Sequence, residues 1–496
     1  MAYLLGYDLG SSSIKASLLA TEGRLVASAV SPQTELTIDA PQPGWAEQHP
    51  ETWWQHVQEA TAMLLAKAAV DPEDIKAIGI SYQMHGLVLV DKTGQVLRPA
   101  IIWCDSRAAG IGDQAFRALG EELCLSRFLN SPGNFTASKL KWVQENEPEI
   151  YQRIYKAMLP GDYLAMKLTG EIKTTPSGLS EGILWDYQEQ RLADLLLEHY
   201  GIDPDLIPEV VPTFAPQGEL TKAAADALGL KPGTPVAYRA GDQPNNAFSL
   251  NVMNPGEVAA TAGTSGVVYG VGAKPDYDPK SRVNTFLHVN HKPEDPRYGI
   301  LLCLNGTGIL NRWLKKNLMD DQVSYEAMNN LAAQVPAGAK GLMIFPYGNG
   351  AERTLENKAI NASIRGLDFN LHHRSHLLRA AQEGIVFALN YGLNIMKTMG
   401  VQTNLVRAGQ ANMFLSPLFC EVFATVTGAR VELYNTDGAQ GAARGAGLGA
   451  GIYPDPNAAF AGLQSQKITE PNPKLVPIYQ ELYEQWASVL ATDLGQ

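Results

Sequence analysis

The sequence predicts an α/β fold, and a pattern that recurs in its two halves suggests that the fold is duplicated. Three observations support this expectation. Short β-favouring runs separated by glycines fill the first hundred residues, a stretch with helical spacing of apolar residues interrupts them at 50–69, and a second β-rich series begins near residue 235. Strands that are mixed with helices in this way are typical of α/β proteins.

The predicted elements follow in chain order. Strands are expected at 3–7, 14–19, 24–30, 77–81, 87–90, 100–103, 236–238 and within 258–271. Helices are expected at 50–69, 134–168, 188–200, 375–398 and 417–427. The proline-rich stretch 204–216 is expected to connect the two halves.

Size and composition indicate a large folded protein. The 496 residues are enough for about three average domains or for two large ones. Hydrophobic residues make up 45% and charged residues 18%, which is ordinary for a globular chain. The net charge of -12 comes without any block of consecutive Lys or Arg, so nucleic acid is not an expected partner.

Other features of the sequence favour a reducing cytoplasm and give no reason to expect a membrane. The four cysteines lie far apart and form no C-x-x-C pair. No run approaches the roughly 18 apolar residues that span a bilayer, and the first residues lack the character of a signal peptide. We therefore predict a cytoplasmic protein without a membrane partner.

Two polar turns could hold phosphate groups. Asp8 leads into Gly10-Ser11-Ser12-Ser13, and the segment 261–266 (Thr-Ala-Gly-Thr-Ser-Gly) is a similar turn in the second half. Glycine lets a backbone approach its ligand, consecutive N–H groups can hold phosphate oxygens, and a carboxylate can reach a hydrated divalent cation. A simple hairpin turn explains either segment alone, whereas the two together favour a nucleotide clamp.

Asp242 could act as a base. It stands in Gly241-Asp242-Gln243, directly after the predicted strand at 236–238. Phosphoryl transfer to an alcohol needs a group that accepts the hydroxyl proton, and a carboxylate can do so. Taken alone, the residue is interpreted equally well as an Asp that caps the following helix.

Two further loops combine apolar or aromatic surface with hydrogen-bonding groups. Met84 and His85 follow the predicted strand at 77–81, and Trp103 and Asp105 stand at the end of the strand at 100–103. This combination suits the two faces of a polyol. A loop histidine without a ligand is the alternative interpretation of His85.

Competing nucleotide-binding signatures are absent from the sequence. The dipeptide Gly-Lys never occurs, which excludes the P-loop motif, and neither H-R-D nor D-F-G of protein kinases is present. The glycine-rich segment 441–451 lacks the spacing of a dinucleotide fingerprint. We interpret it as a run of small residues that allows close backbone packing.

These motifs together resemble the FGGY family of carbohydrate kinases over nearly the whole chain. Residues 135–142 (Phe-Thr-Ala-Ser-Lys-Leu-Lys-Trp) resemble the family's first signature. Residues 362–367 and then 376–383 resemble its second, with Gln382 where an apolar residue is usual. Within the family, Gln83-Met84-His85-Gly86 is most similar to kinases of D-xylulose.

The resemblance implies an α/β fold with two actin-like ATPase (ribonuclease H-like) domains and a cleft between them. A sugar-binding domain is expected at 1–246 and an ATP-binding domain at 247–496. The implied cofactors are ATP and Mg²⁺, the implied partner is a small sugar, and a homodimer is suggested.

Site residues follow from the same resemblance. Asp242 is implied as the catalytic base, and Asp8 and Asp242 are implied near the metal. The implied sugar-binding residues are Met84, His85, Trp103, Asp105, Asp242 and Gln243. The implied ATP-binding residues are Gly10, Ser11, Ser12, Ser13, Lys15, Gly263, Thr264, Ser265, Gly409, Gln410 and Asn412.

The expected function is ATP-dependent phosphorylation of D-xylulose to D-xylulose 5-phosphate, with Asp242 as the base. A kinase of another ketose or polyol, such as ribulose or L-xylulose, is an alternative within the family. A non-catalytic actin-like ATPase is the alternative from another class. A sugar-binding regulator that has lost catalysis is disfavoured, because both Asp8 and Asp242 are present.

Overall fold

The computed structural model describes residues 1–319 and 322–495, which form two compact units. Unit 1 comprises Met1–Asn251, Phe286–Tyr298 and Thr436–Leu463. Unit 2 comprises Val252–Thr285, Gly299–Asn435 and the chain from Gln464 onward. The assignment of 1–246 to sugar binding and of 247–496 to ATP binding stays a prediction.

The sheet of unit 1 has the strand order β13-β14-β5-β1-β2-β3. Strand β1 pairs antiparallel with β2 and parallel with β5, and β5 pairs parallel with β14. The edge strand β13 is antiparallel to β14. The strands are β1 (Tyr3–Leu9), β2 (Ile14–Ala20), β3 (Leu25–Ser31), β5 (Ile75–Tyr82), β13 (Phe214–Glu219) and β14 (Pro235–Gly241).

The second large sheet has the order β17-β18-β16-β15-β21-β22-β23, in which β17 is Asn284–Leu287. Its strands from β18 to β23 repeat the arrangement of the first sheet. Strand β15 pairs antiparallel with β16 and parallel with β21, β21 pairs parallel with β22, and the edge strand β23 is antiparallel to β22. The predicted duplication of the fold is therefore confirmed. The strands are β15 (Val258–Ala262), β16 (Gly266–Gly272), β18 (Tyr298–Leu304), β21 (Leu405–Gly409), β22 (Arg430–Tyr434) and β23 (Ser465–Thr469).

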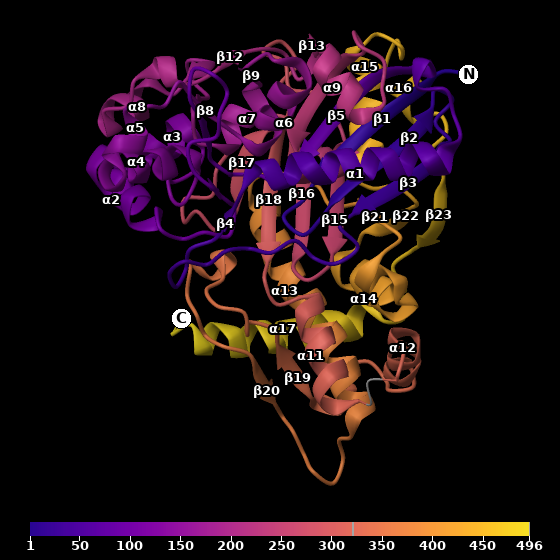
Figure 1. Ribbon diagram of the computed structural model, residues 1–496. Coiled ribbons are helices and arrows are strands. Elements are labelled where there is room, and N and C mark those ends of the chain that lie inside the picture. The colour runs from indigo at the N-terminus through magenta and orange to yellow at the C-terminus, as the bar shows by residue number, and fades with distance from the viewer. Residues whose placement is uncertain (320–321, 496) are drawn as a thin grey trace. The chain divides into compact units, whose positions relative to one another are not determined.

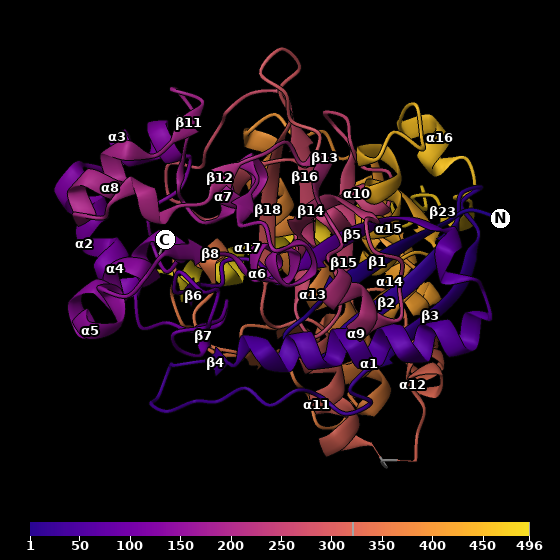
Figure 2. The ribbon, with the colours of Figure 1, turned by 45° about the horizontal axis from the view of Figure 1, so that its top comes forward.

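Helices surround each sheet, and α2, α3, α4, α5 and α8 gather on one side of unit 1 (Figures 1 and 2). The helices of unit 1 are α1 (Pro50–Ala68), α2 (Ala109–Leu119), α3 (Glu121–Phe128), α4 (Thr136–Asn146), α5 (Pro148–Tyr151), α6 (Pro160–Thr169), α7 (Pro176–Glu181), α8 (Asp194–Tyr200), α9 (Lys222–Leu228), α10 (Asp242–Ser249), α15 (Gly438–Gly449) and α16 (Pro456–Phe460). Those of unit 2 are α11 (Gly308–Leu318), α12 (Tyr325–Ala333), α13 (Arg374–Thr398), α14 (Pro417–Thr427) and α17 (Val476–Asp493).

The remaining strands are short. They are β4 (Glu47–Gln48), β6 (Val88–Val90), β7 (Ala100–Ile101), β8 (Lys156–Met158), β9 (Lys173–Thr174), β10 (Trp185–Asp186), β11 (Arg191–Leu192), β12 (Glu209–Val210), β17 (Asn284–Leu287), β19 (Met343–Phe345) and β20 (Ser363–Arg365). Among the residues with described coordinates, no helix combines the length and apolar character needed to cross a membrane.

The stretch predicted as helical at 134–168 is helical over most of its length, but it is not continuous. The structure divides this stretch into α4, α5, β8 and α6. Pro148 begins α5 and Pro160 begins α6, because proline lacks the N–H of a helix interior and its ring clashes with the preceding turn. The helix predicted at 188–200 begins only at Asp194.

Helices α1 and α15 cover opposite faces of the unit 1 sheet. The hydroxyl oxygens of Tyr7 in β1 and Thr61 in α1 lie 2.7 Å apart. The preceding residue, Gly6, faces α15 instead, where a Cβ would lie 1.9 Å from the Ala439 carbonyl oxygen. Successive strand residues point to opposite faces, so the two helices sandwich the sheet. Figure 1 shows α1 running across this sheet.

The glycine-rich helix α15 packs directly against strand backbone. A Cβ on Gly79 of β5 would lie 1.9 Å from the Ala442 carbonyl oxygen. On the helix side, a Cβ on Gly449 would lie 1.8 Å from the Ala237 carbonyl oxygen of β14. The predicted close packing of the small residues in 441–451 is confirmed, and glycine is needed on both partners.

We expect Gly79→Ala to destabilise the protein by about 1–3 kcal/mol or more, because the new methyl group has no space. Gly110→Ala in α2 is the control, since a Cβ there meets no atom within 4 Å. Alanine in a helix should leave stability unchanged or raise it by about 0.5–1 kcal/mol. Chemical denaturation measures both, and equal midpoints for the two variants would contradict the packing argument.

Candidate active site

The ends of three neighbouring strands bring polar residues together at one edge of the unit 1 sheet. Asp8 of β1 is in register with Ser81 of β5, and Tyr82 of β5 is in register with Gly241 of β14. All three strands are parallel, so their carboxyl ends meet at the same edge. Asp242 follows immediately after β14. Asp8, Ser81 and Asp242 therefore share this edge.

Asp8 is held near the tight turn that follows β1. Its Oδ1 accepts a hydrogen bond from the Ser81 hydroxyl at 2.8 Å. The Gly10 N–H donates to the Ser13 carbonyl at 3.1 Å, which closes the predicted phosphate turn before β2. Burial raises the pKa of Asp8 and the negative charge of Asp437 adds to the increase, while the Ser81 hydrogen bond and Lys15 oppose it.

The amino end of α15 reaches the same edge. Lys15 forms an ion pair with Asp437 in which Nζ and Oδ2 are 2.6 Å apart, so this predicted ATP-binding residue already has a partner. Asp437 caps α15 by accepting the Gln440 N–H at 2.9 Å. A Cβ on Gly438 would lie 2.3 Å from Asp8 Oδ2. Asp437 was not among the predicted site residues, although an Asp before a run of small residues is a recognisable capping signal.

Asp242 is the first residue of α10, and the N-cap position belongs to Gly241. The structure therefore does not support the alternative that Asp242 is the capping residue. Burial raises the pKa of Asp242 to about 7, and the negative charge of Asp8 contributes. A hydrogen bond from the Gln243 amide at 3.1 Å opposes this increase. A carboxylate with a pKa near neutrality is well matched to accepting a proton.

The two predicted sugar residues after β5 lie against the same strand end. A Cβ on Gly241 would lie 2.6 Å from Met84 Cγ, so Met84 packs directly on the residue before Asp242. His85 has φ +61, a left-handed conformation that is uncommon for histidine. Its Nδ1 is 2.8 Å from the Glu181 carbonyl oxygen. Because a carbonyl only accepts, Nδ1 carries the proton, and Nε2 is then an acceptor suited to a hydroxyl.

Glu181 belongs to the site region but was missed by the sequence analysis. Its side chain is buried, and Oε2 would lie 2.4 Å from a Cβ on Gly241. Burial raises its pKa well above the ordinary range, and the charges of Asp242 and Asp162 contribute. A single Glu in a loop-like stretch carries no signal of such a position, because only the fold brings α7 beside the end of β14.

Trp103 and Asp105 have different surroundings. Trp103 is 52% exposed, and its indole N–H donates to the Ser11 hydroxyl at 3.3 Å, which joins a predicted sugar residue to a predicted phosphate turn. Asp105 is fully buried and accepts hydrogen bonds from the Ala46 N–H at 2.6 Å and the Arg107 guanidinium at 2.7 Å. The sugar contact of Asp105 stays a prediction. In the structure, its hydrogen bonds to Ala46 and Arg107 hold the loop in place.

The remaining predicted ATP-binding residues lie together in unit 2. Gly263, Thr264 and Ser265 form the turn between β15 and β16. The first turn of α11 docks onto it, with the Gly308 N–H donating to the Gly263 carbonyl at 2.8 Å. A Cβ on Gly263 would lie 3.4 Å from the Asn412 amide nitrogen.

Gly409 and Gln410 follow β21 and adjoin β22. Gly409 is the last residue of β21, and the Gln410 N–H donates to the Tyr434 carbonyl at 2.9 Å. Gln410 and Asn412 are exposed, and Asn412 has φ +54. Sequence segments far apart in the chain thus form one group in unit 2, as they do in unit 1.

The carboxylates at the strand ends of unit 1 fit a hydrated Mg²⁺. This ion typically binds one or two carboxylates and completes its octahedron with water and substrate phosphates. Asp8 and Asp242 offer that number of carboxylates, and the charge of Asp8 makes ionisation of Asp242 more costly, which a cation relieves. Within the described part of the chain, no group of three or more His, Cys, Asp or Glu side chains forms a closed metal cage.

Comparison with known proteins identifies the family. Residues 3–249 match the N-terminal domain of the FGGY family of carbohydrate kinases, and residues 258–452 match its C-terminal domain. The chain belongs to the FGGY family of carbohydrate kinases. The resemblance expected from the sequence is confirmed.

Individual relatives cover nearly the whole chain. The xylulose kinase of Escherichia coli is 32% identical over 93% of this chain and 92% of its own length. The crystal structure of xylulose kinase from Rhodospirillum rubrum is 28% identical, covers 99% of this chain and 98% of its own, and superposes with a TM-score of 0.86. A gluconate kinase from Lactobacillus acidophilus has a TM-score of 0.90 at 22% identity, over 99% of this chain and 98% of its own, which shows the shared fold.

These findings confirm the predicted fold class, two α/β domains of the actin-like ATPase type, and the predicted enzyme class. The protein is a carbohydrate kinase, and membership of the family implies that it uses ATP and a sugar as substrates. The alternative of a non-catalytic actin-like ATPase is not supported.

We expect Gly241→Ala to raise the KM for the sugar by about five- to thirtyfold, which corresponds to 1–2 kcal/mol. The new methyl group would displace Glu181 and Met84, which lie within 2.6 Å of its position. Steady-state kinetics with Gly110→Ala as the control measures the effect. An unchanged KM for Gly241→Ala would show that these two side chains do not shape the sugar site.

Proposed function

We propose that the enzyme transfers the γ-phosphoryl group of ATP to the 5-hydroxyl of D-xylulose, giving D-xylulose 5-phosphate and ADP. The relatives from Escherichia coli and Bacillus subtilis, both named xylulose kinase, support this choice of sugar at 32% and 30% identity. Met84 and His85 beside Asp242 also support it, because they offer an apolar face and a hydroxyl acceptor close to a carboxylate.

Asp242 is the base in this proposal. As the 5-oxygen of the sugar attacks the γ-phosphorus, the O–H bond breaks and its proton passes to the Asp242 carboxylate. The bond between the γ-phosphorus and the bridging oxygen breaks, and its electrons leave with ADP. The single observation that carries the assignment is the position of Asp242 at the shared strand edge, with its pKa raised to about 7.

The other residues bind and orient the substrates. His85 Nε2 would accept a hydrogen bond from a sugar hydroxyl, while Trp103 and Met84 would pack against carbon atoms of the sugar. Gln243 orients Asp242 through its 3.1 Å hydrogen bond. When bound, Mg²⁺ near Asp8 would neutralise phosphate charge. The proposed ATP contacts are the turn 10–13, Lys15, the turn 263–265, Gly409, Gln410 and Asn412.

A gluconate kinase has the same fold, so the fold does not determine which sugar is phosphorylated. The identity of the sugar has to be measured. A coupled ADP-release assay at fixed Mg-ATP would compare D-xylulose, L-xylulose, ribulose, gluconate and glycerol. We expect D-xylulose to have the highest kcat/KM. A comparable kcat/KM for ribulose would contradict the assignment of D-xylulose as the substrate, but the protein would still be a carbohydrate kinase. The cytoplasmic location and the homodimer stay predictions.

We expect Asp242→Asn to lower kcat by about 10²–10⁴-fold, the usual contribution of a general base. The amide has nearly the same shape but cannot accept the proton. Asp226→Asn in α9 is the matched control and should behave like the parent, because the Asp226 side chain is 63% exposed. Turnover of Asp242→Asn within tenfold of the parent would refute the base assignment.

The pH dependence of kcat/KM offers a separate check. Only the deprotonated form of Asp242 accepts a proton, and burial has moved its pKa upward, so activity should increase as the pH rises toward 7. A bound cation lowers the pKa of a nearby carboxyl, which places the acidic limb of the profile at or below about 7. Activity that falls as the pH rises from 5 to 7 would contradict this role.

A further inference from the structure

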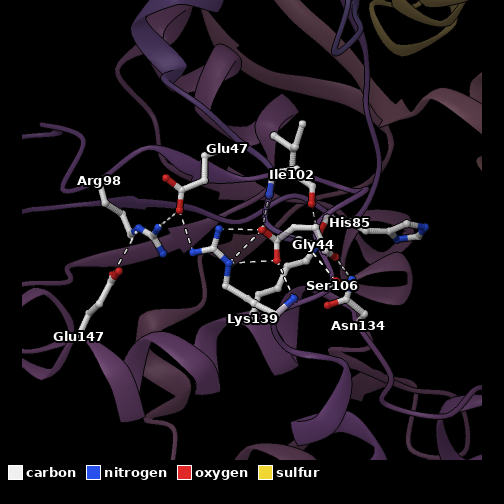
Figure 3. Close-up of polar contacts among 12 residues, drawn as sticks. Gly44, Glu47, His85, Arg98, Ile102, Ser106, Asn134, Lys139 and Glu147 are labelled. Atoms are coloured by element: carbon white, nitrogen blue, oxygen red, sulfur yellow. Dashed lines mark hydrogen bonds and ion pairs between the residues drawn. The ribbon is translucent and has the colours of Figure 1, made fainter. Parts of the chain in front are cut away.

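A buried lysine connects the two loops that carry the proposed sugar contacts. Lys139 lies on α4 and is fully buried. Its Nζ donates to the His85 carbonyl oxygen at 2.8 Å and to the Ile102 carbonyl oxygen at 3.0 Å. Figure 3 shows the ammonium group reaching these two backbone positions. His85 itself is a proposed sugar contact, and Ile102 directly precedes Trp103.

The backbone at His85 needs such support. Its φ of +61 is a left-handed conformation, which is energetically unfavourable for a residue with a Cβ and is stabilised by contacts that fix it. Lys139 fixes the carbonyl of this residue, while the Glu181 carbonyl fixes its ring at 2.8 Å from Nδ1. Main chain and ring of His85 are therefore held from different helices, α4 and α7.

The loop after Ile102 is held by the same network. Asp105 accepts hydrogen bonds from Ala46 and Arg107, and the Asn134 amide donates to the Asp105 carbonyl oxygen. The guanidinium of Arg107 lies 3.8 Å from the centre of the Trp45 ring. Figure 3 shows Asn134 beside Lys139. The loop that contains Trp103 therefore has little freedom while the network is intact.

The charges around Lys139 come close to balance. Three carboxylates, Glu47, Asp105 and Glu147, face the guanidinium groups of Arg98 and Arg107. Burial lowers the pKa of Lys139 to about 7, while the carboxylate of Asp105 opposes the decrease. A neutral amine keeps two N–H donors, so Lys139 can hold both carbonyl oxygens in either protonation state. Burying a lysine amine lowers the stability of the fold, so filling space alone does not explain Lys139 well.

We propose that Lys139 is a positioning residue for the sugar, acting through the backbone of His85 and Ile102. The inference rests on the proposed function, because it takes His85 and Trp103 as sugar contacts. It predicts an effect confined to one substrate. Loss of Lys139 should weaken binding of the sugar and leave binding of ATP unchanged. If Lys139 contributed to stability alone, its loss would weaken binding of both substrates or of neither.

The test compares Lys139→Met with Lys141→Met. Lys141 is two positions away on α4, and among the described residues its bonds are local, to Gln144 at 2.7 Å and Glu145 at 3.3 Å. We expect Lys139→Met to raise the KM for D-xylulose at least about tenfold, or 1.4 kcal/mol, with the KM for ATP within twofold of the parent. Lys141→Met should match the parent for both. Equal changes in both KM values, or no change in folded Lys139→Met, would overturn the proposal.

A second variant and a second readout keep the test decisive. If Lys139→Met fails to fold, Lys139→Gln replaces it, because its shorter side chain retains two N–H donors. This variant must also raise the KM for D-xylulose without raising the KM for ATP. Hydrogen exchange of the ligand-free protein should be faster over 83–86 and 102–105 in the Lys139 variants and unchanged in Lys141→Met. If the parent phosphorylates no ketose, the proposed function fails, and unchanged exchange at these segments would separately overturn the positioning role.

Discussion

The direct contact between the backbone of α15 and the strands of unit 1 is the constraint on which the candidate site depends. Gly6 and Gly79 let the helix approach so closely that a Cβ would overlap its carbonyl oxygens. This approach carries the amino end of α15 to Asp8, and the Asn245 amide of α10 bonds the Gly438 carbonyl at 2.9 Å. A larger residue at Gly6 or Gly79 would push α15 away from the sheet and separate its amino end from Asp8.

Burial at the carboxyl ends of β1 and β14 also changes the pKa values of the acidic residues placed there. Burial raises the pKa values of Asp8 and Asp242, and the negative charges of neighbouring carboxylates add to the increase. Such an arrangement lowers stability, and functional sites are where proteins retain it. The same principle applies to Lys139, whose buried amine is surrounded by carbonyl oxygens and paired charges.

The sequence allowed the fold class, the duplication and the polar turns to be predicted, because these depend on local patterns. The glycine-rich segment 441–451 was correctly interpreted as close packing, since glycine and alanine leave almost no side-chain volume between a helix and its neighbour. The helical character of 134–168 agrees with the sequence pattern, but Pro148 and Pro160 start new helices and divide the stretch. Glu181 could not be found from pattern alone, because only the fold brings α7 beside Gly241. The capping signal of Asp437 is visible in the sequence, but only the close packing of α15 brings this residue near Asp8.

We propose that this carbohydrate kinase phosphorylates the 5-hydroxyl of D-xylulose, with Asp242 as the base. The most direct measurement is nuclear magnetic resonance of the product formed from Mg-ATP and D-xylulose labelled with ¹³C at carbon 5. We expect coupling between ³¹P and the labelled carbon with the parent enzyme, and no such coupling with Asp242→Asn over the same period. Phosphate on a different carbon, or ADP formed without any phosphorylated sugar, would contradict it.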